Sequence, residues 1–505
     1  MKRLVFCGDD IVQVDIPDHT RVLRAPEPLP GLVDYEAEVR RALRNPAGTK
    51  PLGELVGGNS RVTIAFDDPC LPLPPLRNDP RGRAVGVILE ELISAGVSTN
   101  NVSLICAIGL HRKWTHRELR SILGKRVWSE LGPVRITNHD SEDPDGMVDL
   151  GSSGGGHPVR VNRAVTESDL LIYVNVNWTS MNGGWKSIIV GLGDYESIRA
   201  HHNVKVLSEG GSVMDTGSKF HEVICDMGKT VGSSARVFTV ETTLNNRIWG
   251  PFLEGFFSLE GANPRLPHRL LAHVPGPSKN AVSTLLRGAY QPVAVNAGSV
   301  DEVHDATLQT LFQQQNVKVE GQTDALLVGV PNLSPYSSFS RINPLLAANT
   351  ALGYVFNMHI GKPPVRKGGV MILAQPFLPG FKQVHHPSYV EFFDRVLPET
   401  LDPREMEEGF EEEFARRPEY IRLYRFGHAY HGVHPFYVWY WCSLALKHLE
   451  RVIVAGAVDH SIPGRMGFES VDTVEEALDR AGETLGKDFS LTHLVIPPIF
   501  ATEVL

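Results

Sequence analysis

Cysteine is scarce in this chain, and the few cysteines follow no paired pattern. Only 5 occur among 505 residues, and none stands in a Cys-x-x-Cys pair. A disulfide framework and a cysteine-based zinc site both need grouped cysteines. The sequence therefore excludes both kinds of site, and we expect the reducing cytoplasm as the location.

Long apolar runs and an excess of positive charge are lacking as well. No apolar stretch approaches the roughly 20 residues that a membrane-spanning helix requires, and the short apolar run within Met1–Asp10 is not a secretory signal. The formal net charge is -9, whereas sequence-independent binding of nucleic acid needs clustered lysine and arginine. We therefore expect no membrane segment and no nucleic-acid partner.

What is present is an ordinary globular composition in a long chain. Hydrophobic residues make up 42% and charged residues 21% of the sequence, which is typical of folded proteins. A chain of 505 residues is too long for one ordinary core and predicts two or three domains. Turn-forming residues cluster around Pro275–Asn280. We therefore expect an N-terminal domain over residues 1–275 and a C-terminal domain over residues 280–505.

Short apolar segments alternate with amphipathic ones along the chain. Buried strands are expected at Arg61–Phe66, Val102–Ile108, Leu170–Val176, Ala325–Val330, Val370–Ala374, Arg451–Ala455 and His493–Ile496. Helices are expected at Tyr35–Leu43, Ala84–Ala95, Thr115–Leu123 and Val474–Leu485. Such alternation is typical of parallel sheets covered on both faces. The predicted fold class is α/β, with two domains of parallel or mixed sheets flanked by helices and an active site in the cleft between them.

Three of the predicted strands run into loops that are suited to function. The three loops are Gly109–Arg112, the glycine-rich turn Met181–Lys186 and Pro331–Pro335. Open α/β sheets bind ligands at the carboxyl ends of their strands. We therefore expect the functional residues in these three loops.

The turn that ends at Lys186 is rich in glycine but is not a Walker loop. A Walker loop has glycine directly before its lysine, whereas Trp185 stands there. Gly183 and Gly184 imply unusual backbone dihedrals or the close approach of a ligand. Lys186 is then a phosphate or carboxylate contact, a covalent attachment point or a solvated surface residue, and the segment alone leaves all three open.

Histidines occupy two further candidate positions. His111 follows a strand and suits a general base near neutral pH, with Arg112 beside it able to hold an anion, although a structural loop histidine is the alternative. His201 and His202 are adjacent, so their side chains point about 100° apart on a helix and seldom bind one metal together. One of the two is able to ligate a metal, and imidazole suits nickel, copper and zinc alike.

Five motifs follow one another between Val62 and Asn203. They are Asp68-Pro-Cys-Leu-Pro-Leu-Pro after a strand, Ala107-Ile-Gly-Leu-His-Arg, His139-Asp140 continuing to Gly151, Asn182-Gly-Gly-Trp-Lys, and His202 sixteen residues beyond Lys186. In order and spacing these motifs resemble the family of nickel-dependent lactate racemases and related 2-hydroxyacid racemases and epimerases. The family's corresponding motifs are Asp-x-Thr-Arg-Pro-x-Pro, Gly-Thr-His-Arg and Ser-Gly-Gly-Ala-Lys.

The resemblance implies a cofactor and the residues that hold it. In that family a nickel-pincer nucleotide, a pyridinium mononucleotide that carries nickel, is attached to the lysine of the Gly-Gly-x-Lys turn, and a histidine binds the nickel. Lys186 is then the attachment point and His202 the metal ligand. Further cofactor contacts are expected from Asp68, Cys70, Gly183 and Gly184.

The resemblance also implies a reaction. A histidine takes the proton of the substrate hydroxyl while hydride leaves the neighbouring carbon for the cofactor, and return of hydride to the other face inverts the centre. His111 matches the family's first base, so His111 and Lys186 are the expected catalytic residues. Arg112, Trp178 and Arg341 are the expected substrate contacts.

The sequence departs from the family where the second base is expected. The family's second histidine, ten residues before the lysine, is Val176 here, and the substrate-anchoring arginine is Leu71. Either another residue supplies the second base or the enzyme handles one stereochemical face. The aromatic residues Trp178, Trp185 and Phe436–Trp441 favour a substrate that is larger or less polar than lactate.

The expected function is therefore racemisation or epimerisation of a 2-hydroxy acid or sugar acid by a nickel-dependent isomerase. A stereospecific oxidoreductase on the same cofactor and a cofactor-free paralogue that binds a small acid are the alternatives. The expected partners are the hydroxy acid substrate and the proteins that synthesise and load the cofactor. Assembly as a homo-oligomer stays open.

Overall fold

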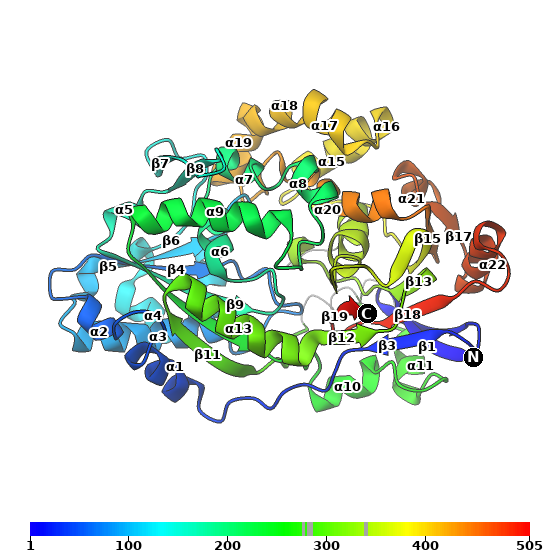
Figure 1. The fold of residues 1–505 in the computed structure, drawn as a ribbon, viewed down its shortest axis with the longest axis horizontal. Helices are drawn as coiled ribbons and strands as arrows, with labels where there is room; N and C mark the ends of the chain where they lie inside the picture. Colours follow the sequence, from blue (N-terminus) through cyan, green and yellow to red (C-terminus); the bar gives the residue numbers. More distant parts are fainter. Residues whose placement is uncertain (275–277, 280–285, 338–341) are drawn as a thin grey trace.

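Two six-stranded sheets form the frame of the molecule (Figure 1). A computed structural model of the chain describes residues 1–274, 278–279, 286–337 and 342–505. The first sheet consists, in spatial order, of β11 (Pro292–Gly298), β10 (Val237–Leu244), β9 (Leu170–Asn177), β4 (Val62–Asp67), β5 (Val102–Ala107) and β6 (Ile136–Asn138). It is parallel except for β11, which runs antiparallel to its neighbour.

The second sheet is parallel throughout. Its strands, in spatial order, are β17 (Glu469–Val471), β16 (Arg451–Ala455), β15 (Val365–Ala374), β13 (Thr323–Gly329), β18 (Leu491–Val495) and β3 (Arg21–Arg24). Each of the seven predicted strands overlaps a strand of these two sheets. The α/β fold class predicted from the alternation of apolar segments is thereby confirmed.

Smaller strand pairings complete the set. They are the hairpin of β1 (Lys2–Cys7) with β2 (Asp10–Asp15), the hairpin of β7 (Met147–Ser152) with β8 (Pro158–Asn162), and a three-stranded sheet of β12 (Asn316–Val319), β19 (Ala501–Val504) and β14 (His359–Ile360).

Helices cover both faces of the first sheet. One face packs against α1 (Tyr35–Arg44), α3 (Pro80–Ser94) and α4 (His116–Leu131), and the other against α6 (Gly184–Gly191), α9 (Lys219–Ser234) and α13 (Val300–Gln315). All three predicted helices on this sheet begin at capping residues. Asp34 accepts the Ala37 N–H at the start of α1, Asp79 accepts the Arg81 N–H at the start of α3, and Thr115 and Glu118 form a capping box at the start of α4.

The second sheet packs α22 (Val474–Leu485) and the β1–β2 hairpin on one face. On its other face lie α14 (Pro344–Ala348), the π-helical segment η4 (Asn349–Val355) and α20 (His434–His448). The other α-helices are α2 (Leu52–Leu55), α5 (Ala164–Glu167), α7 (Tyr195–Arg199), α8 (Val204–Glu209), α10 (Pro251–Phe257), α11 (Leu266–Ala272), α15 (Pro387–Glu391), α16 (Leu397–Glu399), α17 (Pro403–Gly409), α18 (Glu411–Arg416), α19 (Pro418–Phe426) and α21 (Ser461–Arg465). Among the helices described, none combines the length and apolar character needed to cross a bilayer.

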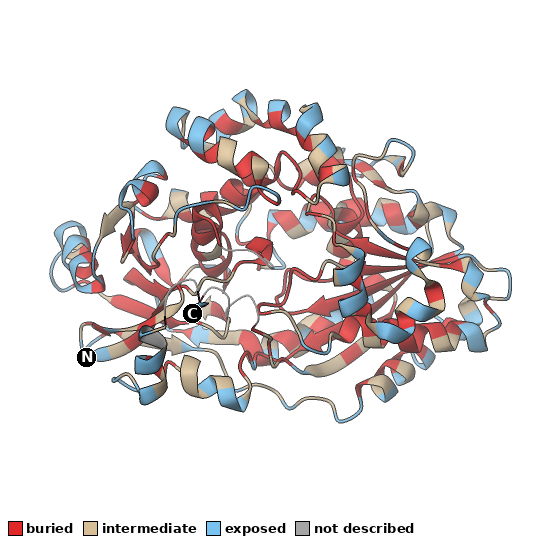
Figure 2. Cartoon of the chain, turned by 180° about the vertical axis from the view of Figure 1, so that it is seen from behind, coloured by how far each residue is buried: buried red, intermediate tan, exposed pale blue. Residues whose placement is uncertain are grey.

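The facing sides of the two sheets share one apolar core. Both sheets are buried (Figure 2), and a single apolar cluster includes Tyr173 and Ile198 beside the first sheet and Tyr336 and Phe436 beside the second. Because burial of apolar surface is the main stabilising term in folding, this shared core holds the two halves against each other. Ligand-binding loops of both halves are thereby brought to one place.

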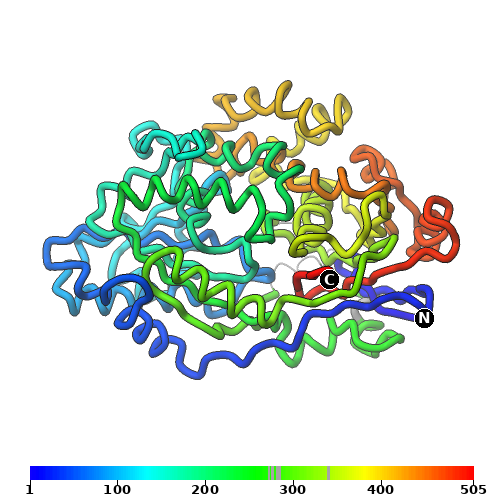
Figure 3. The backbone as a smooth tube through the Cα atoms, viewed as in Figure 1, coloured from blue at the N-terminus to red at the C-terminus, as the bar shows by residue number. Residues whose placement is uncertain are grey.

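The two sheets do not divide the chain at a single point. Strand β3 precedes every strand of the first sheet yet pairs with β18 of the second, whereas β11 joins the first sheet from beyond residue 280. After β3 the chain runs along the lower edge of the molecule to α1 (Figure 3). The predicted boundary at Pro275–Asn280 falls largely on residues outside the described ones, so the division into residues 1–275 and 280–505 stays a prediction. Strands β3 and β11 pair across this predicted boundary because the edge of a sheet offers unpaired backbone groups to any strand that reaches that edge.

Candidate active site

The carboxyl ends of three neighbouring strands bring most of the predicted site residues together. Strands β9, β4 and β5 lie side by side and parallel, so the loops that follow them meet at one edge of the sheet. A cavity lies there, as expected of a ligand site at the carboxyl edge of an open α/β sheet. Its lining includes Asp68, Cys70, His111, Gly183, Lys186 and His202 of the first half, and Tyr336, Tyr354 and Trp441 of the second.

His111 is held at the cavity by a carboxylate. Its Nδ1 lies 2.7 Å from Asp68 Oδ2. The other carboxylate oxygen of Asp68 accepts hydrogen bonds from Trp114 Nε1 at 2.8 Å and from the Cys70 backbone N–H at 3.0 Å. A carboxylate that accepts the Nδ1 proton leaves the Nε2 lone pair of the imidazole available to a substrate, which is the arrangement of an oriented general base.

The loop that carries Asp68 and Cys70 is anchored by a buried arginine that the sequence analysis did not single out. Arg81 is fully buried, forms ion pairs with Asp67 at 2.8 Å and Asp79 at 2.9 Å, and also donates to the Leu71 carbonyl oxygen. A bidentate arginine in a buried setting fixes both orientation and distance. Arg81 thus positions the proline-rich loop from inside the protein.

The glycine turn has the unusual dihedrals that its sequence predicted. Gly183 has φ of 100° and Gly184 has φ of 57°. A Cβ on Gly183 would lie 2.3 Å from Asn177 Nδ2, 2.5 Å from Glu241 Oε1 and 2.8 Å from His304 Nδ1. The close approach that requires glycine therefore comes from the protein's own side chains below the turn.

Glu241, a residue of β10, stabilises this turn through hydrogen bonds. Its carboxylate is fully buried, accepts the Gly184 N–H at 2.7 Å and lies 3.2 Å from both Asn177 Nδ2 and His304 Nδ1. The pKa of His304 is raised because the attraction and hydrogen bond of Glu241 outweigh burial. Glu241, paired with His304, thus holds the backbone that presents Lys186 to the cavity.

Lys186 enters the cavity from the first turn of α6. Burial lowers the pKa of Lys186, although the nearby groups Cys70, Asp67 and Asp68 oppose that shift. In the described part of the chain no carboxylate lies within ion-pair distance of its amine. A lysine whose pKa is lowered by desolvation has a larger neutral, nucleophilic fraction, so this position suits covalent attachment better than a solvated surface role.

Of the two adjacent histidines, His202 is the one that lines the cavity. Burial lowers the pKa of His202 to about 3, so its ring is neutral at neutral pH and able to ligate a metal. The Nδ1 atoms of His201 and His202 lie 2.7 Å apart, so one ring donates to the other. Donation from His202 leaves its Nε2 lone pair for the cavity, and His201 acts as the partner that sets this tautomer.

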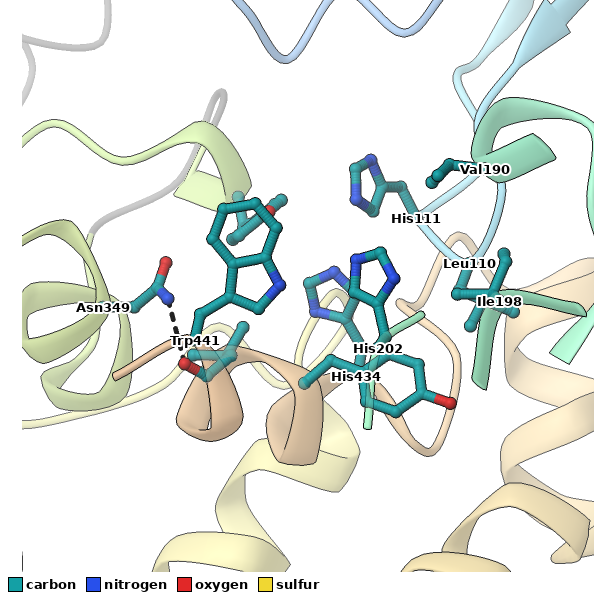
Figure 4. Close-up of a pocket in the computed structure, with 11 residues that line it drawn as sticks. Leu110, His111, Val190, Ile198, His202, Asn349, His434 and Trp441 are labelled. Carbon is teal, nitrogen blue, oxygen red and sulfur yellow. Dashed lines mark hydrogen bonds between the residues drawn. The ribbon is translucent and has the colours of Figure 1, made fainter. Parts of the chain in front are cut away.

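The second half adds aromatic and histidine side chains that local sequence motifs did not reveal. His434 is the first residue of α20, is 4% exposed, and lines a connected cavity together with His111 and His202. Figure 4 shows these three rings gathered around one space, with Trp441 beside them. Burial lowers the pKa of His434 well below its ordinary value, which keeps the ring neutral. Only the packing of α20 against the first half brings it there.

Two predicted substrate contacts lie away from this cavity, and the third is outside the described residues. Arg112 is 2% exposed, pairs with Glu118 at 2.8 Å and lies over the Trp114 ring at 4.3 Å. Its guanidinium is therefore committed within the protein, because the capping-box glutamate of α4 satisfies it. Arg341 belongs to residues 338–341, which the structure does not describe.

Trp178 lines an adjoining cavity whose walls are almost wholly apolar. Its indole packs edge to face with Tyr290, with ring centroids 5.9 Å apart. Tyr354 lines both this cavity and the one that contains Lys186. Trp178 therefore lines a neighbouring apolar space and not the cavity that contains Lys186.

The fold and site define an α/β protein with a ligand cavity at the carboxyl edge of a parallel sheet, closed by residues of a second sheet. Residues 7–215, less than half of the chain, match the family model described as lactate racemase N-terminal domain. The resemblance to lactate racemases that the five motifs indicated is thereby confirmed for this stretch.

Relatives of known sequence and structure agree with this assignment. The lactate racemase of Thermoanaerobacterium thermosaccharolyticum is 29% identical over 168 residues, which are 32% of this chain and 37% of that protein. The lactate racemase of Lactiplantibacillus plantarum is 27% identical over 221 residues, 42% of this chain and 49% of that protein. The sequence matches thus span less than half of either relative.

Solved structures extend the likeness of fold to nearly the whole chain. The lactate racemase apoprotein from Thermoanaerobacterium thermosaccharolyticum has a TM-score of 0.65 at 18% identity and covers 98% of this chain and 99% of its own. A protein from Thermotoga maritima has a TM-score of 0.52 at 14% identity, over 93% of this chain and 98% of its own. The two-sheet architecture is therefore a known one.

Proposed function

We propose that this protein is a racemase or epimerase of a 2-hydroxy acid that works with a covalently attached nickel-pincer nucleotide. The observation that carries the proposal is the convergence of Lys186, His202 and the carboxylate-oriented His111 on one cavity. A binding module for a small acid needs neither an attachment lysine nor a metal ligand nor a base. The lactate racemase relatives support the same reaction class.

The residues present fit such a cofactor. Lys186 offers an amine that pairs with no carboxylate in the described part of the chain, and burial favours its neutral form. His202 offers a neutral imidazole at the same cavity, and imidazole is a good ligand for nickel. Lys186 would therefore hold the nucleotide and His202 its metal, with Asp68, Cys70 and Gly183 lining the same space. When bound, the group supplies reversible acceptance of hydride.

His111 is the general base in this proposal. Asp68 takes its Nδ1 proton in a hydrogen bond, so the Nε2 lone pair is available to accept the proton of the substrate hydroxyl. General-base catalysis of this kind contributes typically 10²–10⁴-fold, roughly, to the rate. The surrounding rings of Tyr336 and His434, with centroids 5.0 and 5.1 Å from His111, exclude water from the proton transfer.

The test is co-expression of the chain with proteins that synthesise the nickel-pincer nucleotide, followed by intact mass and nickel analysis. We expect a mass increment and about one nickel per chain, as a single attachment lysine requires, and loss of both in Lys186→Ala. Lys229→Ala is the matched control, because Lys229 is exposed on α9. Loss of nickel with retention of the mass increment is expected in His202→Ala. An unmodified mass without nickel in the wild-type protein would refute the cofactor assignment and favour a cofactor-free protein that binds a small acid.

A stereospecific oxidoreductase on the same cofactor is the second candidate. It is favoured by Val176, a buried apolar residue in β9, at the position where the family carries its second histidine. In this case the nickel-loaded protein exchanges a C2 deuteron of a single enantiomer without inverting it. Appearance of the opposite enantiomer excludes this candidate.

The proposal carries expectations about partners and location. Loading requires the proteins that synthesise and deliver the nucleotide, and the scattered reduced cysteines suit the cytoplasm. Fractionation and light scattering of the native protein test the location and a homo-oligomeric state.

A further inference from the structure

We infer that His434 is the second acid–base residue of this site and serves the substrate enantiomer that His111 does not. This inference rests on the proposed function and adds the residue that its stereochemistry requires. It rests on the arrangement of two imidazoles, those of His111 and His434. They come from different halves of the molecule and face one cavity beside the metal-ligand candidate His202.

The ring of His434 is held with one nitrogen toward the protein and the other toward the cavity. Tyr389, which is fully buried, places its hydroxyl 2.5 Å from His434 Nδ1. Among the described residues no hydrogen-bond partner of His434 Nε2 is found, and the ring lines the cavity. In the tautomer with its proton on Nδ1, His434 donates to the tyrosine oxygen and keeps a lone pair on Nε2 that faces the cavity.

The approach of His434 to His111 is built into the contact between the halves. Their ring centroids lie 5.1 Å apart with planes at 81°. The segment before α20 is bonded to the loop that carries His111: the His431 N–H donates to the Leu110 oxygen at 3.0 Å, and the Tyr424 hydroxyl donates to the Gly109 oxygen at 2.8 Å. These bonds fix the relative position of the two imidazoles.

Two bases are needed because the enantiomers present their hydroxyl groups differently. If the hydrogen on C2 faces one hydride acceptor and the carboxylate is held, the hydroxyl and the side chain exchange places between the two enantiomers. One base then cannot reach both hydroxyl groups without rearrangement. Two imidazoles that approach the same space at nearly a right angle meet this requirement.

The step balances as follows. The substrate O–H bond breaks and its proton moves to Nε2 of one histidine, while the C2–H bond breaks and its electron pair leaves as hydride to the pyridinium cofactor. The substrate would be oxidised to a 2-keto acid, with the two electrons held by the bound nucleotide. The proton then passes from Nε2 of the first histidine to Nε2 of the second, and their ring centroids lie 5.1 Å apart. Return of the hydride to the other face, with that proton, would give the opposite enantiomer and leave both imidazoles neutral.

The test uses the nickel-loaded protein and one enantiomer of lactate at a time. Rapid mixing and acid quench measure the pyruvate formed in the first turnover from D-lactate and from L-lactate. We expect His434→Asn to lower this rate by about 100-fold or more for one enantiomer and only a few-fold for the other, because a general base is worth about 10²–10⁴ in rate. His111→Asn is expected to show the opposite preference.

Two further variants separate this role from a loss of packing. His386→Asn removes another buried imidazole of the same aromatic cluster. His386 is not among the described residues that line the cavity, so this variant is expected to change the first-turnover rates of the two enantiomers equally. Tyr389→Phe tests positioning and is expected to give the enantiomer-selective loss in a weaker form. Equal effects of His434→Asn on both enantiomers, or no effect, would overturn the inference.

A second readout does not depend on turnover. Histidine ring resonances of the protein as purified, assigned with the His434→Asn variant, are followed on addition of oxamate, a planar analogue of pyruvate. A shift of the His434 ring resonance that saturates with oxamate supports contact with the substrate, and no shift overturns it. Failure of the proposed function is separate, because it shows as absent nickel or as no 2-keto acid from either enantiomer of lactate or of 2-hydroxyisocaproate in the wild-type protein. In that case the oxamate shift alone decides whether His434 contacts the substrate.

Discussion

Asp68 Oδ2 and His111 Nδ1 lie 2.7 Å apart, although 43 positions separate the two residues in the sequence. The carboxylate follows β4 and the imidazole follows β5, and these strands are parallel neighbours in the first sheet. The pair is thus a direct product of strand order. It converts a loop histidine into an oriented base, and several properties of the protein depend on it.

Replacement of the carboxylate by an amide is expected to disable this base. In Asp68→Asn the amide N–H faces Nδ1 and forces the imidazole proton onto Nε2, so the lone pair toward the cavity is lost. We expect kcat for lactate to fall by about 10²–10⁴-fold with little change in KM. Steady-state rates from pH 5 to 9 measure the effect.

Trp114→Phe is the matched control for this variant. It removes the hydrogen bond to the other carboxylate oxygen and leaves the bond to His111, so kcat is expected to fall by less than about tenfold, in line with one hydrogen bond. An Asp68→Asn protein with wild-type kcat would show that His111 does not act as the base.

A methyl group on Gly183 is expected to disrupt the turn that presents Lys186. The residue has φ of 100°, and a Cβ would lie under 3.0 Å from three side chains, those of Asn177, Glu241 and His304. We expect Gly183→Ala to destabilise the protein by roughly 2–5 kcal/mol and to lower the nickel content of the loaded protein. Thermal melting and metal analysis measure the two effects.

Gly124→Ala provides the comparison for backbone strain alone. Gly124 also has a positive φ, 80°, but no atom lies within 4 Å of its Cβ position. We expect a cost of about 1 kcal/mol and unchanged nickel loading. If Gly183→Ala and Gly124→Ala have the same melting temperature, the crowding around a Cβ on Gly183 does not add to the loss of stability.

Glu411 is expected to make stability depend on pH. This carboxyl is fully buried on α18, where Tyr195 and Tyr440 donate to it and Arg199 pairs with it at 3.1 Å. Burial raises its pKa to about 7, so the folded state binds its proton more tightly than the unfolded chain. The stabilisation is full below the unfolded value near 4.3 and is lost as the pH rises through 7.

Chemical denaturation at pH 5 and pH 8 measures this effect. The wild-type protein is expected to be less stable at pH 8 by up to about 3 kcal/mol from this group. Glu411→Gln keeps an uncharged acceptor of the same size and is expected to flatten that part of the pH dependence. If Glu411→Gln shows the same difference in stability between pH 5 and pH 8 as the wild-type protein, that difference arises from other titratable groups.

Substrate preference is expected to favour apolar side chains. The apolar cavity that contains Trp178 borders the Lys186 cavity through Tyr354. Each buried CH₂ contributes about 0.8 kcal/mol, or roughly fourfold in kcat/KM. We therefore expect kcat/KM to rise from lactate through 2-hydroxybutyrate to 2-hydroxyisocaproate. Leu333→Trp narrows the apolar cavity and is expected to remove the rise with little effect on lactate; a flat series in the wild-type protein would contradict this use of the cavity.

Much of the first sheet and its loops could be predicted from local sequence. The apolar segments that became β4, β5 and β9 are continuous and short, as strands buried on both faces must be. Asp68, His111, Gly183, Lys186 and His202 were identified from motifs in the loops that follow, and all of them line the cavity. Arg112 shares the same motif as His111, yet its guanidinium turns toward Glu118, because the pattern of a loop does not state which way each side chain points.

What the sequence determined by itself is the α/β class, the resemblance of its first part to lactate racemases, and the first-half residues of the cavity, since each is written in contiguous segments whose periodicity and spacing are local properties. What only the tertiary structure decided is which distant side chains complete the cavity. His434, Tyr336 and Trp441 reach it because α20 and its neighbours pack against the first sheet through one apolar core. Apolar burial is non-directional, so the sequence of α20 predicts that it is buried but not against what, and the partner of His111 emerges only when the two halves are packed together.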